Sequence, residues 1–298
     1  MKRTFVLLVG ICLFALPSFA QNARSFVSTS GNDANVCTLA SQCRTFGRAI
    51  TQTNAGGEII ALDSGGMGQS FTIDRAITIS AAPGVAATVS GTINHVITVN
   101  AGSSDRVVLR NLTILGSPTI AGIIVTSVGD LHIEGCTILG SNTGVWAITG
   151  GFLTIKDTEV ISPVQIGFNT RIPSLIMHSR VVHSSNFGIE IEGGPVSLID
   201  VVVKDCASTG INVVNNFLTG PFAVTCDHCT SSHNDFGVGV IGNTGAVTFR
   251  MDNCEITDNI TVGIAIANLG VAVSMGNNMI EGSGLLDVNG TITPLTKY

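Results

Sequence analysis

A short sequence unit repeats along most of the chain and limits what the chain can fold into. The unit is clearest at Val247–Asn268, where alternating apolar residues precede Asn253-Cys254, a polar stretch and the word Gly263-Ile264-Ala265-Ile266. Alternation indicates strands, and the polar stretch indicates a turn. Two markers keep the same period, a polar-led tetrad and a Gly-apolar-x-apolar word, so the repeat predicts a solenoid. The tetrads begin at Asn111, Gly135, Asp157, Ser179, Asp200, His228, Asn253 and Asn277, and the words begin at Gly122, Gly144, Gly188, Gly210, Gly237 and Gly263, with Gly167 a poorer copy.

A coil of about 22 residues with three short strands and no helical pattern predicts an all-β parallel β-helix of about ten coils. Each strand then pairs with its equivalent one coil on, about 4.8 Å away. Stacked Val, Ile, Leu and Phe side chains fill the inside. A leucine-rich repeat has a similar period, but it requires a regular leucine frame and a helical or extended back, which these repeats lack.

The tetrads and the glycine words resemble those of the right-handed parallel β-helix proteins of the pectin-lyase-like superfamily, from roughly Ile59 to Gly290. Val27–Asp33, Cys37 and Cys43–Phe46 also resemble the N-terminal segment of uncharacterised secreted bacterial members. The resemblance implies the fold and its right-handedness. It implies little about activity, because the superfamily includes lyases, hydrolases, epimerases, adhesins and proteins with no known activity.

Three segments are expected along the chain. Residues 1–20 have two basic residues, an apolar run and a small-x-small site before Gln21, which predicts a secretory signal peptide. Residues 21–58 form an N-terminal cap, with a short helix at Thr45–Asn54 ended by Gly56-Gly57. Residues 59–298 form the β-helix. The sequence does not indicate what caps its C-terminal end.

Composition limits the compartment and the partners. The chain has 14 Lys and Arg against 20 Asp and Glu, a net charge of −6, and no basic patch, which argues against nucleic acid as a partner. After the leader, no segment is long and apolar enough to span a membrane. We therefore expect a secreted or periplasmic monomer whose partner, if any, is an extracellular polysaccharide.

Seven cysteines follow the predicted leader, namely Cys37, Cys43, Cys136, Cys206, Cys226, Cys229 and Cys254. Export makes disulfides favourable, and Cys37 and Cys43 flank a short loop, so we expect them to pair. Cys229 and Cys254 occupy the same slot of consecutive coils, which allows either a disulfide or a stack of free thiols. The CxxC spacing of Cys226 and Cys229 lacks a second pair or a histidine, so no metal site is predicted.

Asp227 and Asp252 form the strongest catalytic candidate. They occupy equivalent outward positions of adjacent coils, with Arg250 and His228 nearby. Two carboxylates about 5 Å apart raise each other's proton affinity, hold a cation together, or act as a retaining glycosidase pair. The alternative is a pair of turn-flanking residues shielded by Arg250.

The segment Cys226–Thr230 resembles the Asp-His signature of pectate lyases, which bind calcium. Those enzymes also need a downstream Arg-x-Pro-x-x-Arg motif. The Arg-x-Pro present here, Arg171–Pro173, lies upstream and has Ile176 at the position of the second arginine. The polygalacturonase motifs are absent. Lyase activity is therefore not carried over, and no cofactor is expected unless calcium serves a lyase.

Other outward residues have simpler interpretations. The residues before the tetrads predict a column that contains Arg110, Glu134, Lys156 and His178, mainly a ladder of surface ion pairs. His178 and His183, with Glu190 and Glu192 on the neighbouring strand, form a weaker acid–base candidate. Trp146 lies at an outward slot and is a candidate glycan contact, although an isolated tryptophan also packs against neighbouring turns.

Two functions remain open from the sequence. Short coils, few aromatic residues and incomplete catalytic motifs favour an exported, non-catalytic β-helix scaffold or surface protein with weak glycan binding. The alternative is a polysaccharide-active enzyme, a uronate lyase or a glycosidase, that uses Asp227, Asp252 and Arg250. Short coils leave little room for the long loops that build a deep pocket.

Overall fold

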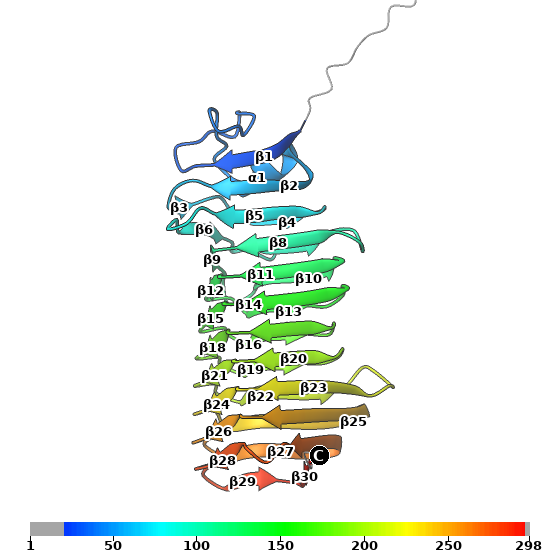
Figure 1. Cartoon of the computed structure of the whole chain (residues 1–298). Helices are drawn as coiled ribbons and strands as arrows, with labels where there is room; N and C mark the ends of the chain where they lie inside the picture. Colours follow the sequence, from blue (N-terminus) through cyan, green and yellow to red (C-terminus); the bar gives the residue numbers. More distant parts are fainter. Residues whose placement is uncertain (1–20, 296–298) are drawn as a thin grey trace, which may run out of the picture.

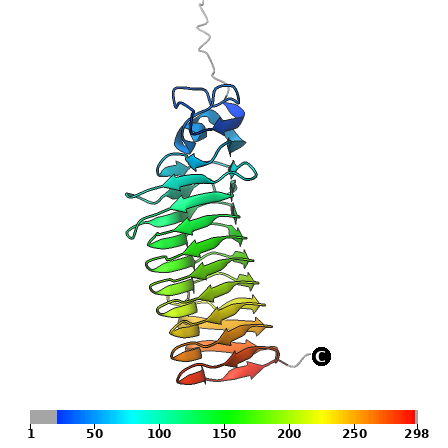
Figure 2. The same cartoon turned by 90° about the vertical axis from the view of Figure 1, so that its left-hand side faces the viewer.

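The computed structural model describes residues 21–295, which wind into a solenoid of stacked coils (Figures 1 and 2). The coils have three parallel faces, here called sheets I, II and III; sheets I and II share two long strands and so form one 20-stranded sheet, and sheet III is separate. Sheet III has ten strands in the described part of the chain, which confirms the predicted all-β solenoid of about ten coils. The predicted signal peptide at residues 1–20 lies outside the described residues.

The strands have the following bounds. Sheet I contains β1 (Asn22–Val27), β2 (Thr53–Ala61), β5 (Ile77–Ala81), β8 (Arg106–Arg110), β11 (Asp130–Glu134), β14 (Phe152–Lys156), β17 (Ser174–Met177), β20 (Val196–Ile199), β23 (Phe222–Asp227) and β30 (Ile292–Pro294). Sheet II contains β4 (Phe71–Ile73), β7 (Ile97–Asn100), β10 (Ala121–Ser127), β13 (Thr143–Ala147), β16 (Ile166–Thr170), β19 (Phe187–Ile191), β22 (Thr209–Asn215) and β29 (Leu286–Asn289). Two long strands, β25 (Phe236–Asp252) and β27 (Val262–Ser274), run through sheets I and II. Sheet III contains β3 (Gly65–Gly66), β6 (Ala87–Ser90), β9 (Leu112–Leu115), β12 (Thr137–Leu139), β15 (Glu159–Ile161), β18 (Arg180–Val182), β21 (Val202–Lys204), β24 (Thr230–Ser232), β26 (Glu255–Thr257) and β28 (Met279–Glu281).

Inward side chains stack on their equivalents one coil away. In sheet I, Leu109, Ile133, Ile155 and Ile176 are in register and are fully buried. Each large aliphatic side chain of this kind stabilises the fold by roughly 1.5–3 kcal/mol. Because successive side chains of a strand point to opposite faces, this inward register also fixes which outward residues form columns along the solenoid axis.

A residue in the left-handed backbone region joins sheet I to sheet III in most coils. Small polar residues and glycine tolerate this conformation best. His178 occupies the position in its coil, with φ 47°, and Arg180 pairs with Glu159. The sequence prediction that the tetrad begins at Ser179 was therefore wrong by one residue, because the left-handed residue sets the register. The outward column contains Met177 where His178 was expected. These turn residues are Asn111, Gly135, Asp157, His178, Asp200, His228 and Asn253.

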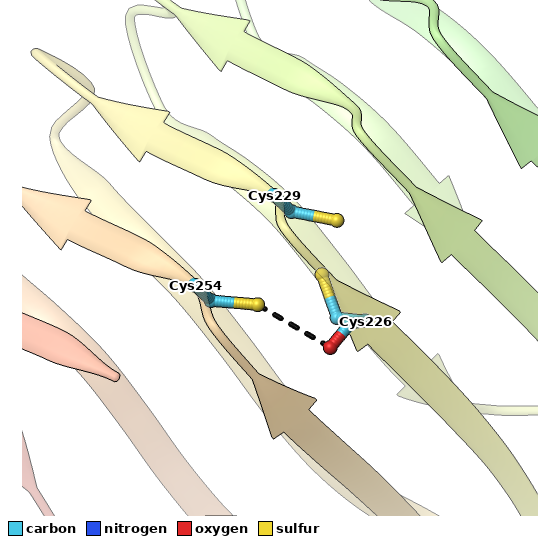
Figure 3. Close-up of side chains that lie close together, drawn as sticks. All are labelled: Cys226, Cys229 and Cys254. Carbon is cyan, nitrogen blue, oxygen red and sulfur yellow. Dashed lines mark hydrogen bonds between the residues drawn. The ribbon is translucent and has the colours of Figure 1, made fainter. Parts of the chain in front are cut away.

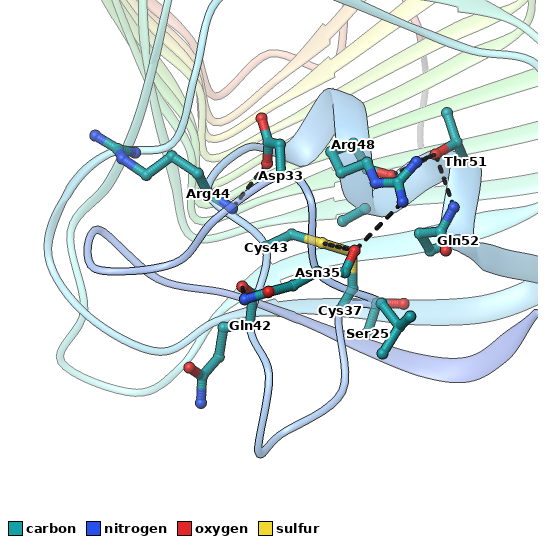
Figure 4. The surroundings of a disulfide bond; sticks show 12 residues. Ser25, Asp33, Asn35, Cys37, Gln42, Cys43, Arg44, Arg48, Thr51 and Gln52 are labelled. Atoms are coloured by element: carbon teal, nitrogen blue, oxygen red, sulfur yellow. Dashed lines mark hydrogen bonds between the residues drawn. A yellow bond between two sulfur atoms is a disulfide. The ribbon is translucent and has the colours of Figure 1, made fainter.

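The N-terminal segment contains the predicted short helix and disulfide (Figure 4). Helix α1 (Phe46–Gln52) begins after the N-cap Thr45 and buries Phe46, Ala49 and Ile50. Cys37 and Cys43 form the expected disulfide. The helix ends at Gln52 rather than at the two glycines, because Thr53 becomes extended and pairs with Asn22 of β1.

The C-terminal end is less covered. β30 is the last strand described, and Leu285 and Leu286 of the final coil are 74% and 51% exposed. Within residues 21–295, no helix has the length and apolar character that a membrane span requires.

Candidate functional site

The third residues of the Gly-apolar-x-apolar words, the positions marked x, form a column on the outside of sheet II. Trp146 of β13 pairs with Asn169 of β16, which pairs with Glu190 of β19, which pairs with Asn212 of β22. Equivalent residues of neighbouring coils are about 4.8 Å apart, so four adjacent coils present an aromatic ring, an amide, a carboxyl and an amide in one line.

Glycine at the start of each word lets the coils pack at this spacing. A Cβ atom on Gly144 would lie 2.5 Å from the carbonyl oxygen of Gly167 and 2.7 Å from Cγ1 of Val160. A larger residue there would push the outward residue Trp146 out of line, so the local backbone and the candidate site are linked.

A surface groove of ≈ 300 Å³ lies along this column, and we call it the sheet II groove. It is lined by Asn142, Thr143, Trp146, Gln165, Ile166, Asn169, Arg171, Glu190 and Glu192. Aromatic, amide and carboxyl groups together suit a ligand that has both an apolar face and hydroxyl groups, such as a sugar.

Hydrogen bonds hold the polar side chains of the sheet II groove. The amide nitrogen of Asn169 donates to Glu190 Oε2 at 2.8 Å and to Glu192 Oε2 at 3.1 Å. Asn212 donates to Glu190 Oε1 at 3.2 Å. Oδ1 of Asn169 is buried and has no hydrogen-bond partner in the protein. A buried acceptor without a partner is energetically costly.

Glu190 differs electrostatically from an ordinary outward glutamate. Burial raises the pKa of its carboxyl above the usual 4.5, and the nearby charge of Glu192 raises this pKa further. The two amide donors, Asn169 and Asn212, oppose the shift in pKa by stabilising the carboxylate. The sheet II groove therefore contains one carboxyl group that holds its proton unusually well.

Arg171 joins the sheet II groove to the longest loop beside it. Its Nε atom lies 3.0 Å from Glu192 Oε2, and this carboxylate is 8% exposed. Its guanidinium also lies 4.4 Å from the ring centroid of Phe217, in the loop between β22 and β23, which is a cation–π distance. Phe217 is 57% exposed, so a second aromatic ring lies next to Arg171 on this side of the molecule.

Trp146 both packs against a neighbour and faces solvent. Its ring contacts His95 edge-on, with ring centroids 6.3 Å apart. The packing alternative left open by the sequence is therefore present. The ring also lines the sheet II groove, and its role as a glycan contact stays a prediction.

The structure also brings together the predicted trio of Asp227, Asp252 and Arg250. Asp227 and Asp252 are in register on β23 and β25, and all three residues line a separate hollow of ≈ 250 Å³. Asp227 Oδ1 lies 2.7 Å from Nδ1 of His228, and Oδ1 of Asp252 is buried without a hydrogen-bond partner. Among the described residues, Arg250 forms no ion pair with either aspartate, so the predicted shielding is not seen.

The other predicted candidates remain on the surface. Arg110 and Lys156 both pair with Glu134, at 2.9 Å and 3.6 Å, which confirms the ion-pair ladder. His178 contacts Asp157 and Asp200 rather than the two glutamates of the sheet II groove. The structure therefore does not assemble the predicted acid–base group of histidines and glutamates.

Comparison with known proteins identifies the family. A family model described as a right-handed β-helix region matches residues 121–280, more than half of the 298 residues. This chain belongs to the right-handed β-helix family. The match confirms the resemblance inferred from the sequence repeats. It also confirms that the β-helix is right-handed.

Solved structures show the same fold. The crystal structure of pectate lyase Pel9A matches with a TM-score of 0.59 and 12% identity, over 85% of this β-helix chain and 68% of the other. The catalytic domain of a GH87 α-1,3-glucanase in complex with nigerose matches with a TM-score of 0.51 and 12% identity, over 95% and 69%. A rhamnogalacturonan lyase matches with a TM-score of 0.50 and 13% identity, over 84% and 72%. At these identities the likeness shows the fold alone.

Sequence reasoning missed most of the sheet II groove, although a signal for it was present. The words at Gly144, Gly167, Gly188 and Gly210 carry the column residues at their third position, so aligning those positions reveals the line of polar groups. In the sequence, Arg171 stands out only as the arginine of the Arg-x-Pro segment that was compared with the pectate lyase motif. Its contacts with Glu192 and Phe217 depend on the loop between β22 and β23, which has no repeated counterpart.

Proposed function

We propose that this protein is an exported β-helix that binds a neutral polysaccharide along the sheet II groove and serves as a rigid glycan-binding scaffold. The proposal includes the division of the chain into a cleaved leader (1–20), an N-terminal cap (21–58) and a β-helix (59–298). The column of Trp146, Asn169, Glu190 and Asn212 is the observation that carries the proposal. A glycan chain is linear and repeats its hydroxyl groups, and this column repeats its polar groups along one axis.

The fold comparison supports a polysaccharide rather than another ligand class. The structures that match are named as a pectate lyase, a rhamnogalacturonan lyase and an α-1,3-glucanase. Each name refers to an enzyme acting on a polysaccharide. A β-helix surface is long and straight, which suits an extended chain.

Charges in the sheet II groove favour a neutral glycan over a polyuronate. Glu190 and Glu192 face a single guanidinium, that of Arg171, which already pairs with Glu192. No unpaired cation therefore remains in the lining of the sheet II groove to bind the carboxylates of a polyuronate. The proposed ligand therefore differs in charge from pectate.

Calorimetric titration with neutral and uronic oligosaccharides tests the proposal. We expect wild-type protein to bind a neutral oligosaccharide. Trp146→Ala should weaken binding by at least about 5-fold, because truncating an aromatic contact of this kind costs more than about 1 kcal/mol. Phe152→Ala is the matched control, since Phe152 is an exposed aromatic residue on β14 of sheet I. Equal loss in both variants, or no binding by folded wild-type protein, would reject the proposal.

Hydrolysis at the same groove is the second candidate function. It is favoured by Glu190 and Glu192, two carboxyl groups that share the amide of Asn169, because burial raises the pKa of Glu190. Glycosidases use such a pair, with one protonated acid and one carboxylate. New reducing ends from a neutral glycan, lost in Glu190→Gln, would establish hydrolysis. If turnover is instead lost in Asp252→Asn, the site is the hollow at Asp227 and Asp252.

A further inference from the structure

Three cysteine thiols meet inside the solenoid, near its C-terminal end (Figure 3). Cys226 lies on β23, and Cys229 and Cys254 follow the turns of two successive coils. Their sulfur atoms all lie within 4.8 Å of one another. The three residues are at most 3% exposed, and none of them forms a disulfide. Cys229 and Cys254 thus follow the stacked-thiol alternative, and Cys226 adds a third sulfur to the stack.

The arrangement has the size of a three-coordinate metal site. A metal–sulfur bond of about 2.3 Å places three sulfurs around a central ion about 4 Å apart. Small rotations of the three side chains satisfy that distance. Within residues 21–295, no histidine, aspartate or glutamate joins the three sulfurs as a further ligand. Zinc takes a fourth ligand, a side chain or a water molecule, and none of the described side chains supplies one in this buried place. Thiolate ligands also suit Cu(I), which makes Cu(I) the better fit to three sulfurs.

A surface hollow lies close to this cluster. It is lined by Asp227, Asp252, Cys226, Met251 and Met275. Cys226 and Met251 are buried, whereas Asp227 and Asp252 occupy outward positions, where their carboxylates attract a cation. Oδ1 of Asp252 is buried and lacks a hydrogen-bond partner. The one guanidinium in the hollow, that of Arg250, opposes cation entry only in part, since two carboxylates face it.

We propose that Cys226, Cys229 and Cys254 bind one Cu(I) ion, which enters through the hollow at Asp252. The ion forms bonds to the sulfurs, and the displaced thiol protons leave to solvent. Copper stays in the same oxidation state, so no oxidant or reductant takes part. The bound ion ties together two successive coils, because Cys226 and Cys229 belong to one coil and Cys254 to the next.

Anaerobic titration of the full chain with Cu(I), in competition with a coloured Cu(I) chelator, tests the proposal. We expect one Cu(I) per chain and a sulfur-to-copper absorption band in the ultraviolet. Cys226→Ser should weaken binding by more than about 100-fold, because loss of an outer partner alone costs 10–100-fold. Cys136→Ser and Cys206→Ser are matched controls, since both thiols are buried, unpaired and outside the cluster.

Several results would overturn the proposal. One is equal Cu(I) binding in wild-type and Cys226→Ser protein. Another is a disulfide between any two cluster cysteines of protein isolated from its exported location, found by mass spectrometry. Cys229→Ala is the second variant should Cys226→Ser fail to fold, and unchanged Cu(I) binding in that variant would also reject the site. A further variant, Asp252→Asn, should slow copper uptake without changing the number of ions bound.

Discussion

Glu190 illustrates how a single outward residue acquires unusual chemistry in this solenoid. Its neighbours one coil away on each side are Asn169 and Asn212, which donate hydrogen bonds but carry no charge. The guanidinium of Arg171 pairs with Glu192 instead. Burial therefore dominates, and the pKa of Glu190 is raised. On the ion-pair ladder, by contrast, Arg110 and Lys156 flank Glu134, and hydrogen bonding to Arg110 lowers the pKa of Glu134.

The raised pKa of Glu190 predicts a pH-dependent effect on stability. A carboxyl group whose folded pKa lies above its unfolded value of about 4.5 binds its proton more tightly in the folded state, so stability is lost as pH rises through the folded pKa. Glu190→Gln removes this loss. We expect the stability of the variant relative to wild type to increase from pH 4 to pH 8, with Glu192 and Arg171 unchanged.

Thermal unfolding of both proteins across that pH range checks this prediction. The matched control is Glu134→Gln, because the pKa of Glu134 is lowered and its ionised form stabilises the fold. This variant should lose stability relative to wild type as pH rises from below the pKa of Glu134. Parallel pH profiles for wild type and Glu190→Gln would contradict the raised pKa.

At the scale of the strand, neighbouring coils approach closely because each Gly-apolar-x-apolar word of sheet II begins with glycine. We predict that Gly144→Ala destabilises the protein by about 1–3 kcal/mol, the usual effect of overpacking a close contact. Gly220→Ala is the control, because a Cβ atom there would meet no atom within 4 Å. Chemical denaturation of both variants measures the difference. Equal stability would show that the coils adjust to the methyl group without cost.

The N-terminal cap is the second element whose stability can be tested. Cys37 and Cys43 close a short loop with a sequence separation of 6, next to α1. Arg48 of α1 also donates a hydrogen bond to the carbonyl of Asn35 in this loop (Figure 4). Replacing both cysteines with serine should destabilise the cap by about 2 kcal/mol, because the unfolded loop gains conformational freedom.

Amide hydrogen exchange locates this effect. We expect faster exchange in β1 and α1, with the central coils from β8 to β22 unchanged, since each coil of a solenoid contacts only its neighbours. Uniformly faster exchange throughout the chain would mean that the cap and the coils unfold together.

The strands and the helix could be predicted from the sequence wherever buried apolar residues repeat at fixed positions. Inward residues such as Ile133 and Ile155 repeat at fixed positions, so the coils, the sheets and the buried face of α1 follow from the pattern. The one-residue error at Ser179 arose because Ser179, a small polar residue, resembles the turn residues of the other coils, whereas His178 takes the left-handed conformation, as His228 does in a later coil. The sheet II groove was harder, because Arg171 and Phe217 meet only through an unrepeated loop.

At the scale of the whole molecule, the solenoid converts sequence repetition into a straight, ordered surface. Outward residues that are more than twenty positions apart in sequence become neighbours in space, as Trp146 and Asn169 do. The sheet II groove on the outside of the coils and the cysteine cluster inside them (Figure 3) arise in the same way. The stack thus forms a surface groove without long loops, which agrees with the short coils of this chain.

The most direct test of the glycan-binding account uses the tryptophan itself. Trp146 is the single tryptophan of the chain, so intrinsic fluorescence reports on the sheet II groove alone. Folded wild-type protein is titrated with neutral oligosaccharides and, separately, with oligogalacturonate. The account predicts a saturable fluorescence change with a neutral glycan and a weaker response to oligogalacturonate. No change with any oligosaccharide at millimolar concentration would contradict it.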